Sequence, residues 1–354
     1  MSVMISKKPW VVIVGGFLGA GKTTLILAAA WELERRGIRS AIILNDQGEA
    51  LVDTDYATRN GRITGEVTGG CFCCRLSDLL RVMEELRAQS PEVIFAEPVG
   101  SCTDISATTL HPLLEYREEY RLAPFTVLVD PERANVLLDA NADPDLSFLF
   151  RKQLQEADLV CFTKSDLYPD YPAIDAQHVR QISARTGEGV AAWLDEILSG
   201  NLKAGKEILE IDYEQYARAE AALAWLNLQV SMEPSIPCSP AMVLGPLLDN
   251  LDKQLTAKNI SIVHLKAILD SPMGFLKAAM CTNGQEPVVE GALDASPASK
   301  HDLLLNLRAV GAGAQVQEIV KQELHRFDGR LTGLHIDCFH PAAPKPERRM
   351  TKVH

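Results

Sequence analysis

The sequence predicts an α/β domain with a mostly parallel sheet and helices on both faces, followed by a smaller α+β domain. Three observations lead to this fold class. Through residue 200, short apolar runs typical of buried strands alternate with helical patterns. After Gly200 this alternation stops, and longer strand-like runs follow one another, as in an antiparallel sheet. The length of 354 residues suits two domains of unequal size.

The elements of the first domain follow from short apolar runs and from helical periodicity. A helix is also expected after a cysteine-rich loop, with Ser77 as its N-cap and with Leu79, Leu80, Met83 and Leu86 on its buried face. The other helices are expected at Lys22–Arg36 and Val190–Leu198, and the strands at Trp10–Val14, Ser40–Asn45, Glu92–Ala96, Phe125–Asp130 and Asp158–Thr163.

The second domain is predicted from longer runs. Helices are expected at Ala241–Lys258 and Gln315–His325, and strands at Ala221–Ser231, Ile260–Leu269, Phe275–Cys281, Asp302–Val310 and Leu331–Phe339. The predicted boundaries are residues 1–203 for the first domain, 204–218 for a linker, 219–342 for the second domain and 343–354 for a tail. The tail is rich in proline and basic residues, so we expect it to be flexible.

Composition narrows the classes of function. Apolar residues make up 47% of the chain and charged residues 23%, enough for a sizeable core, and the net charge is −12. That acidity argues against general nucleic-acid binding. No apolar run is long enough to span a bilayer, and the glycine-broken N-terminal stretch does not resemble a signal peptide. We therefore expect a cytoplasmic protein with reduced cysteines, in which Cys102, Cys161, Cys238 and Cys281 are small buried side chains.

A phosphate-binding loop is the first functional motif. Gly16, Gly19, Ala20, Gly21, Lys22 and Thr23 belong to a stretch that fits G-x-x-x-x-G-K-[ST], with Thr24 next, between a predicted strand and a predicted helix. Glycines let backbone amides surround a phosphate, and the helix N-terminus favours an anion. Lys22 would reach the β and γ phosphates, and the Thr23 hydroxyl would bind Mg²⁺.

Two later motifs indicate that the base is guanine. Thr163, Lys164 and Asp166 form T-K-x-D, a variant of the guanine-selecting N-K-x-D, and Ser183-Ala184 resembles the loop that closes over the base. The Asp166 carboxylate can accept hydrogen bonds from the imino and amino groups of guanine, whereas adenine would leave buried polar groups unpaired. We therefore expect GTP and GDP rather than ATP.

Acidic loops would complete the Mg²⁺ and γ-phosphate site. Glu97 and Gly100 follow an apolar strand as D-x-x-G does in GTPases, with Asp104 a second acidic candidate nearby. The loop from Asn45 to Asp53 carries further carboxylates that could become ordered around the γ-phosphate. Hydrolysis should be slow, because these segments contain no obvious arginine finger. Arg59 and Arg62 are the only nearby options.

Cys71, Cys73 and Cys74 form a cluster that predicts a soft-metal site. Thiolates favour Zn²⁺, Co²⁺ or Cu⁺ over Mg²⁺, and the following helix N-terminus together with Arg75 should favour the thiolate form. Three sulfurs leave a tetrahedral set one ligand short, which suits a transferable ion. Glu49 or Asp53 could complete the set in one nucleotide state. Buried core cysteines, a redox pair and iron–sulfur ligands remain alternatives, and His335, Cys338 and His340 are a second metal candidate.

Together these motifs resemble the CobW-like family of metallochaperone GTPases, related to the nickel-inserting GTPases of hydrogenase and urease maturation. GGFLGAGKTT, NDQGEALVD, GGCFCC, EPVG and TKSD occur in the family's order between residue 10 and about residue 200. The resemblance implies a GTPase that binds Zn²⁺, Co²⁺ or a similar ion through C-x-C-C and delivers it to a client metalloprotein or cofactor-assembly protein, with a homodimer left open.

Some residues depart from the family pattern. Thr163 stands where the family usually has Asn, Asp104 where it usually has Pro, and the eight histidines are scattered rather than gathered in one stretch. Two other functions stay open. A P-loop small-molecule kinase predicts preference for ATP, which Asp166 argues against. A non-enzymatic redox or iron–sulfur scaffold predicts a coloured protein without nucleotide turnover.

Overall fold

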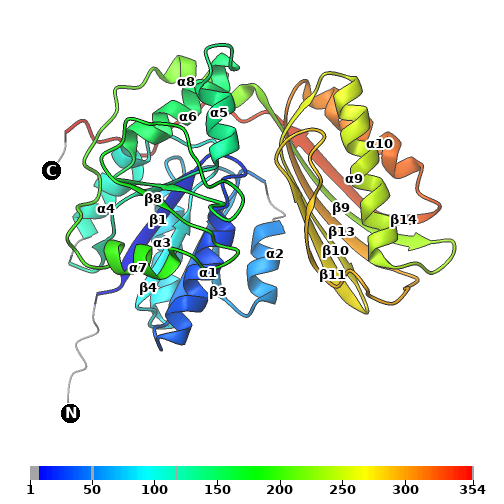
Figure 1. The fold of residues 1–354 in the computed structure, drawn as a ribbon, viewed down its shortest axis with the longest axis horizontal. Helices are drawn as coiled ribbons and strands as arrows, with labels where there is room; N and C mark the ends of the chain where they lie inside the picture. The colour runs from blue at the N-terminus through cyan, green and yellow to red at the C-terminus, as the bar shows by residue number, and fades with distance from the viewer. Residues whose placement is uncertain (1–7, 49–51, 117, 353–354) are drawn as a thin grey trace. The chain divides into compact units, whose positions relative to one another are not determined.

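The computed structural model describes residues 8–48, 52–116 and 118–352, which form two compact units (Figure 1). The first unit comprises Met1–Gln47, Ala57–Ala219 and Ala343–His354. The second comprises Gly48–Tyr56 and Glu220–Ala342. Two short segments, Gly48–Tyr56 and Ala343–His354, thus belong to a different unit from the residues next to them in the sequence.

The first unit is built on a parallel sheet whose described strands run in the order β3-β2-β4-β1-β6-β7-β8, with β5 beside β1. Its central strands are almost entirely buried, because helices cover a sheet of this type and its strands can be apolar throughout. The strands are β1 (Trp10–Gly16), β2 (Ser40–Asn45), β3 (Ile63–Val67), β4 (Val93–Glu97), β5 (Arg121–Leu122), β6 (Thr126–Val129), β7 (Leu159–Phe162) and β8 (Val179–Gln181).

Helices connect these strands, and α1, α3 and α6 lie against the sheet. Asp130 and Asp143 cap α5 and α6 by accepting hydrogen bonds from the first-turn amides, and each is followed by a proline at the first helical position. The helices are α1 (Lys22–Arg35), α2 (Val52–Arg59), α3 (Leu76–Arg87), α4 (His111–Leu113), α5 (Pro131–Leu138), α6 (Pro144–Glu156), α7 (Val190–Ile197) and α8 (Tyr213–Ala221), with a π-helical turn at Ser106–Leu110 and a 3-10 turn at Leu114–Tyr116.

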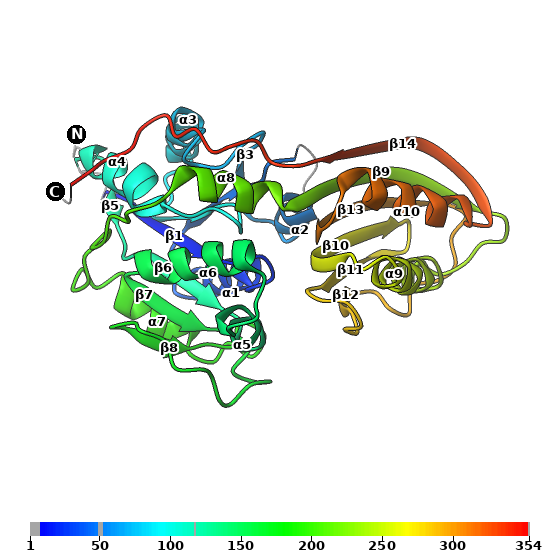
Figure 2. The ribbon, with the colours of Figure 1, turned by 90° about the horizontal axis from the view of Figure 1, so that it is seen from above.

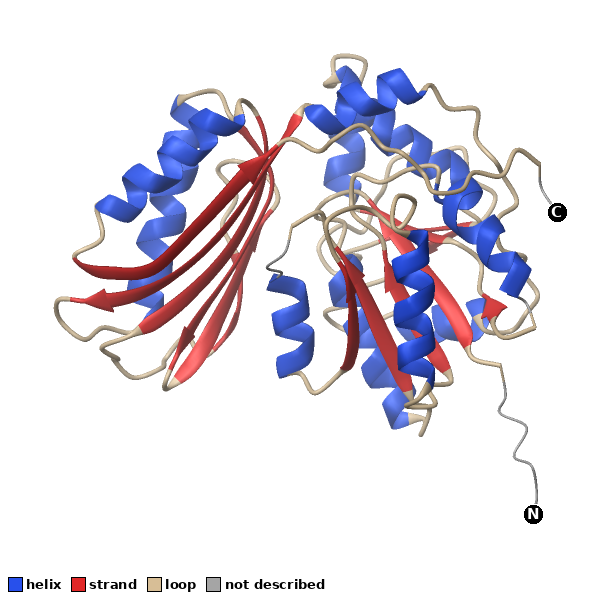
Figure 3. Cartoon of the chain, turned by 180° about the vertical axis from the view of Figure 1, so that it is seen from behind, coloured by secondary structure: helices blue, strands red, loops and turns tan. Residues whose placement is uncertain are grey.

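The second unit is an antiparallel sheet with two helices on one face (Figure 3). Its described strands run in the order β12-β11-β10-β13-β9-β14. Alternate strand residues such as Leu226, Leu265 and Leu305 pack with Leu251 and Val320 from the helices to form the core. The elements are β9 (Leu223–Pro234), α9 (Pro240–Ala257), β10 (Ser261–Ser271), β11 (Gly274–Met280), β12 (Val288–Gly291), β13 (His301–Val310), α10 (Gly313–His325) and β14 (Gly329–Phe339). Both units confirm the predicted fold class.

Two segments differ from the prediction. The expected linker, residues 204–218, lies along the first unit, where the Gly205 and Lys206 amides donate to the Asp158 carboxylate at 2.7 and 2.9 Å. The expected flexible tail lies there too, and its trace passes α3 (Figure 2). Composition predicted mobility for the tail, but specific hydrogen bonds to backbone and carboxylate groups hold it in place.

Candidate functional site

The phosphate-binding loop joins β1 to α1 and surrounds the Lys22 ammonium. Gly21 has φ 90°, a left-handed conformation that suits glycine, and it is the N-cap of α1. The Lys22 Nζ donates to the carbonyl oxygens of Gly16 at 3.0 Å and Phe17 at 3.4 Å. The lysine is buried within the loop, at the point where the α1 amides begin. This arrangement fits a phosphate bound between the loop and Lys22.

Glu97, at the end of β4, meets the two functional side chains of α1. The Thr23 hydroxyl donates to Glu97 Oε1 at 3.2 Å, and Lys22 Nζ lies 3.9 Å from the same carboxylate. Hydroxyl and carboxylate oxygens are the donors that Mg²⁺ prefers, so the residues present fit that ion. Gly100 approaches so closely that a Cβ there would lie 2.9 Å from Lys22 Nζ and 2.9 Å from Leu18 Cδ2. The loop after β4 therefore lies against Lys22.

The candidate base site lies after β7. Lys164 adopts φ 57°, and its Nζ donates to Asp130 Oδ2 at 2.5 Å, so the lysine is held at the end of β6. Asp166 is exposed, whereas Ser183 is buried and its hydroxyl accepts from the Thr186 amide at 3.1 Å. The Ser165 amide donates to the Ile182 carbonyl at 3.3 Å and so joins the two loops. The structure brings both motifs together; Asp130 is a partner that sequence reasoning missed.

The three thiols of the cysteine motif form one cluster. Their sulfur atoms all lie within 4.8 Å of one another, with Cys71 Sγ 2.6 Å from Cys73 Sγ and 3.5 Å from Cys74 Sγ. Asn45 holds the loop that carries them. The Nδ2 group of its side chain donates to the Gly70 carbonyl at 2.7 Å and to the Val67 carbonyl at 2.9 Å. The Oδ1 atom of the same side chain accepts from the Phe72 backbone amide at 3.0 Å. Three soft sulfur donors gathered in one group fit one Zn²⁺ or Co²⁺ ion.

The helix after the motif begins two residues earlier than predicted. Arg75, not Ser77, is the N-cap of α3, and it offers no capping side chain. Ser77 lies inside the first turn, where its amide and hydroxyl donate to Glu347 Oε2 at 2.9 and 2.6 Å. The Glu347 carboxylate from the tail therefore satisfies a first-turn amide of α3, the role that the sequence analysis gave to Ser77. Glu347 is remote in sequence, so the local pattern did not reveal it.

The thiols are less acidic than the sequence predicts. Contacts with the Cys102 thiol are the largest cause that raises the pKa of Cys71 and of Cys73, and burial adds to both shifts. The contact with Cys71 is the largest cause that raises the pKa of Cys74. The expected effects of Arg75 and the helix N-terminus are outweighed, because sulfurs packed this closely disfavour additional negative charge. Thiol protons therefore have to leave when an ion binds.

Cys102 is the cysteine whose place sequence reasoning missed. Its thiol is the first cause of the raised pKa of Cys71 and of Cys73, although it was expected to be an ordinary buried side chain. It is indeed only 3% exposed, and it lies in the loop after β4, two residues beyond Gly100. Its sequence neighbours have no metal-ligand spacing, so the only signal was its position shortly after the Glu97–Gly100 motif.

A strap formed by residues 345–350 covers the cysteine loop. The Lys345 amide donates to Cys74 Sγ at 3.2 Å, and the Glu347 amide donates to the Cys73 carbonyl at 3.0 Å. Further along, Arg348 Nη1 donates to Glu115 at 2.6 Å, and the Met350 amide donates to the Ala107 carbonyl at 2.9 Å.

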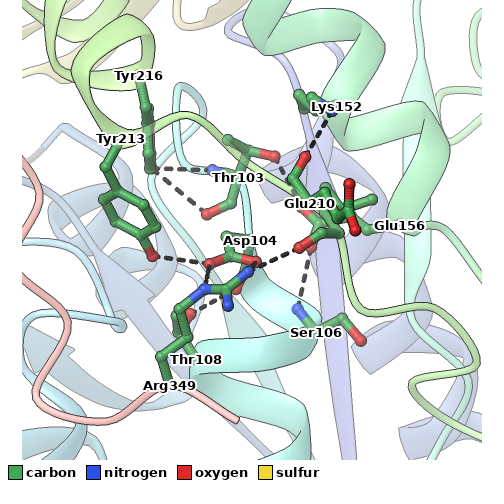
Figure 4. Close-up of polar contacts among 11 residues, drawn as sticks. Thr103, Asp104, Ser106, Thr108, Lys152, Glu156, Glu210, Tyr213, Tyr216 and Arg349 are labelled. Atoms are coloured by element: carbon green, nitrogen blue, oxygen red, sulfur yellow. Dashed lines mark hydrogen bonds and ion pairs between the residues drawn. The ribbon is translucent and has the colours of Figure 1, made fainter. Parts of the chain in front are cut away.

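Arg349 anchors the strap to Asp104 (Figure 4). The Asp104 carboxylate, 1% exposed, accepts from Arg349 Nε at 2.7 Å and from the Tyr213 hydroxyl at 2.7 Å. From the sequence, Asp104 was a second candidate for an acidic residue near Mg²⁺. In the structure its carboxylate instead pairs with Arg349 and accepts from Tyr213. Beside it, burial raises the pKa of Glu156 to about 8, although the Ser106 amide donates to it at 3.0 Å.

Other expected site residues have different surroundings. Glu49 lies outside the described residues. Asp53 pairs with Lys266, and Arg62 pairs with Glu34 while its guanidinium lies 4.1 Å from the Trp31 ring centroid. These partners give both charged groups a structural role.

In the second metal candidate, Cys338 and His340 make hydrogen bonds with backbone groups. His340 Nε2 accepts from the Gly313 amide at 3.1 Å and Nδ1 contacts the Leu223 carbonyl at 3.1 Å, while Cys338 Sγ donates to the Gly313 carbonyl at 3.3 Å. The group of potential metal ligands found in the described part of the chain is Cys71, Cys73 and Cys74.

Comparison with known proteins identifies the family. The model of the CobW/HypB/UreG nucleotide-binding domain matches residues 10–189, which span both nucleotide motifs and the cysteine cluster. The chain belongs to the CobW/HypB/UreG family. This match confirms the resemblance drawn from the motifs. Members of the family are GTP-binding P-loop proteins. No described helix combines the length and apolar character needed to cross a bilayer.

Several curated relatives are zinc chaperones. The chain is 30% identical over 156 residues to the zinc chaperone YeiR of Escherichia coli, covering 44% of this chain and 46% of that protein. It is 30% identical over 218 residues to the zinc chaperone CobW of Pseudomonas aeruginosa, covering 53% and 56%. The chain thus spans about half the length of these relatives.

Solved structures show more distant likeness. HypB from Helicobacter pylori in complex with nickel aligns with a TM-score of 0.42 at 15% identity, covering 54% of this chain and 86% of that one. Zn(II)-bound YjiA GTPase from Escherichia coli aligns with a TM-score of 0.32 at 15% identity, covering 91% and 99%. The family assignment rests on the sequence match.

Proposed function

We propose that this protein is a metallochaperone GTPase. It binds one soft divalent ion, Zn²⁺ or Co²⁺, through Cys71, Cys73 and Cys74, and GTP with Mg²⁺ at the loop around Lys22. Hydrolysis of GTP to GDP and phosphate loosens the metal site, and the ion passes to a client metalloprotein or cofactor-assembly protein. The zinc-chaperone names of the relatives support the metal, and the family supports the nucleotide.

The contact of Asn45 with the cysteine loop carries this proposal. Strands β2 and β4 are neighbours, and Leu44 pairs in register with Glu97, the carboxylate that meets Thr23. The next residue, Asn45, bonds to Gly70 and Phe72 on either side of Cys71. A shift of β4 or β2 on nucleotide binding would therefore move the thiols.

The positions of the nucleotide-site residues support the following proposed roles. Lys22 would neutralise the β and γ phosphates, Thr23 and Glu97 would hold Mg²⁺, and Gly100 would sense the γ-phosphate through its amide. Mg²⁺, when bound, would neutralise phosphate charge during transfer. Asp166 would accept from guanine, with Lys164 and the Ser183-Ala184 loop beside the ring. Hydrolysis would be slow, because the Arg62 guanidinium is engaged with Glu34 and Trp31.

The test is the affinity for Co²⁺, measured by thiolate-to-cobalt absorbance with GDP or with a non-hydrolysable GTP analogue. Because metal and GTP would favour the same loop arrangement, we expect tighter binding in the GTP state, by about 5–150-fold for a typical coupling of about 1–3 kcal/mol. Asn45→Ala should reduce this ratio toward one while leaving the three thiols in place. Equal affinities in the two nucleotide states of the wild type would contradict the coupling.

Two controls assign the signal. Replacing Cys71, Cys73 and Cys74 together by serine should abolish Co²⁺ binding, whereas Cys161→Ser, in buried β7, should not change it. ATP in place of GTP should leave the Co²⁺ affinity at its nucleotide-free value. A response to ATP equal to that with GTP would favour the P-loop kinase alternative.

A further inference from the structure

We propose that the strap, residues 345–350, is a lid on the cysteine site and that the bound nucleotide controls its opening. This inference rests on the proposed function and specifies how release of the ion from the same site is regulated. While GTP is bound, the closed strap keeps the ion in place. In the GDP state the strap lifts, and a ligand group of the client reaches the ion.

The strap lies on the most accessible of the three thiols. Cys71 and Cys73 are 6% and 1% exposed, whereas Cys74 is only partly buried. The Lys345 amide donates to Cys74 Sγ at 3.2 Å, and the Glu347 amide donates to the Cys73 carbonyl at 3.0 Å. Hydrogen bonds to a ligand sulfur stabilise its bound form. Lifting the strap would therefore remove both the cover of Cys74 and a hydrogen bond that supports it.

The strap is fastened at two places by side chains. At the first, the Glu347 carboxylate accepts from the Ser77 amide at 2.9 Å and from the Ser77 hydroxyl at 2.6 Å. At the second, Arg349 Nε donates to the Asp104 carboxylate at 2.7 Å (Figure 4). The first contact is exposed, whereas Asp104 is 1% exposed. Opening at Arg349 costs more, because it leaves a buried charge without its partner.

The second fastening belongs to the loop that lies against the phosphate-binding lysine. A Cβ at Gly100 would lie 2.9 Å from Lys22 Nζ, and Asp104 follows four residues later in the same loop. The Gln153 side chain on α6 donates to the carbonyl oxygens of Gly100 and Cys102, both at 2.9 Å, and so holds the loop together. A shift of Gly100 on loss of the γ-phosphate would therefore reach Asp104 and weaken the fastening there.

The turn after Asp104 carries a further contact with the strap. The Asp104 carbonyl accepts from the Thr108 amide at 3.0 Å and from the Thr108 hydroxyl at 2.6 Å, so the residue is tied to the π-helical turn. Ala107, in this turn, accepts from the Met350 amide at 2.9 Å. One movement of the loop would therefore loosen both contacts at this end of the strap.

The experiment follows loss of Zn²⁺ from the loaded full chain to an excess of the chelator pyridylazoresorcinol, whose absorbance reports the transferred ion and which leaves Mg²⁺ with the nucleotide. The rate is measured with GDP and with a non-hydrolysable GTP analogue. In the wild type we expect loss to be at least about tenfold slower with the analogue, the effect of keeping one hydrogen bond to a charged group.

Variants of the second fastening test the role of the strap. Arg349→Met should raise the rate with the analogue by at least about tenfold and bring the rates of the two nucleotide states within about twofold of each other. Arg349→Lys keeps the charge and a donor, so it should restore part of the difference. Arg36→Met is the matched control, because its guanidinium pairs with Glu32 on α1 and Asp195 on α7, and it should leave both rates unchanged.

A second measurement needs no variant. Hydrogen exchange of the Glu347 and Met350 amides in the Zn²⁺-loaded wild type should be faster with GDP than with the analogue, because both amides donate to carbonyl groups outside the strap only while it is closed. Equal exchange in the two states would overturn nucleotide control of the strap, even if Arg349→Met did not fold.

Failure of this inference is distinguishable from failure of the proposed function. If Arg349→Met kept the wild-type difference in Zn²⁺ loss between the two nucleotide states, the strap would not be the lid. Equal rates of loss in the two states of the wild type would overturn the lid as well. In both cases the chaperone proposal stands if the equilibrium affinity for Co²⁺ is still tighter in the GTP state. Absence of metal binding by the wild type would overturn both proposals.

Discussion

Replacing Arg349 by methionine should destabilise the first unit through Asp104, a carboxylate buried at the anchor of the strap. Methionine keeps the apolar stem but removes hydrogen bonds of 2.7 and 3.3 Å from the guanidinium. Removing one partner of a fully buried ion pair costs about 3–5 kcal/mol. Arg349 is 28% exposed and the Tyr213 hydroxyl still donates to Asp104, so we expect a loss of about 2 kcal/mol.

The assay is urea unfolding followed by tryptophan fluorescence in a Trp225→Phe background. Trp225 belongs to the second unit, so Trp10, Trp31 and Trp193 would then report on the first unit. Arg348→Met is the matched control, because its ion pair with Glu115 is exposed at both ends and should contribute no more than about 1 kcal/mol. Equal losses for the two variants would refute the reasoning.

A double-mutant cycle isolates the pair itself. Asp104 has φ 63°, a left-handed conformation that asparagine also tolerates, so Asp104→Asn changes the charge with little added backbone strain. In the Asp104→Asn background, Arg349→Met should cost less than in the wild type, because no buried charge is left uncompensated. A cost that stays the same in both backgrounds would show that Arg349 acts through other contacts.

Three further predictions concern pH and nucleotide. Burial raises the Glu156 pKa to about 8, so the folded state keeps a proton that the unfolded state releases above about 4.5; stability should fall by at most about 5 kcal/mol as pH rises through that window, and Glu156→Gln should remove this slope in urea titrations at each pH. Lys22→Ala should abolish GTP binding and phosphate release, whereas Lys8→Ala, which removes an exposed ion pair, should leave both intact. Asp166→Asn should weaken GTP and strengthen xanthosine triphosphate in competition assays, and ATP binding wild type as tightly as GTP would refute the guanine assignment.

Much of the fold is readable from the sequence, because buried parallel strands are continuous apolar runs. Ser40–Asn45 was predicted with its observed bounds, and β4 and β7 lie within one residue of the predicted ranges. The helices α5 and α6 were missed although a signal was present, since each begins with Asp-Pro, an N-cap followed by proline. β3 was missed because ITGEV is short, half-buried and interrupted by glycine.

The candidate site was only partly readable for a different reason. Contiguous motifs identify Lys22, Asp166 and the cysteine cluster, because each needs a local backbone shape. Glu347 caps α3 from 270 residues away, so no local pattern marks this contact. Asp104 was interpreted as a residue near Mg²⁺ because it follows Glu97 closely in the sequence. That spacing could not reveal its ion pair with Arg349, which lies far along the chain.

The division of the chain into units has a practical consequence for work with isolated domains. The chain passes between the units at residues 47/48, 56/57, 219/220 and 342/343, so no single cut separates them. A fragment of residues 1–219 carries every nucleotide motif and the cysteine cluster, yet lacks the amide that donates to Cys74 and the guanidinium that pairs with Asp104. Metal affinities measured on such a fragment would describe an uncovered site, and joining residues 343–354 to it through a short glycine-rich linker should restore the missing contacts.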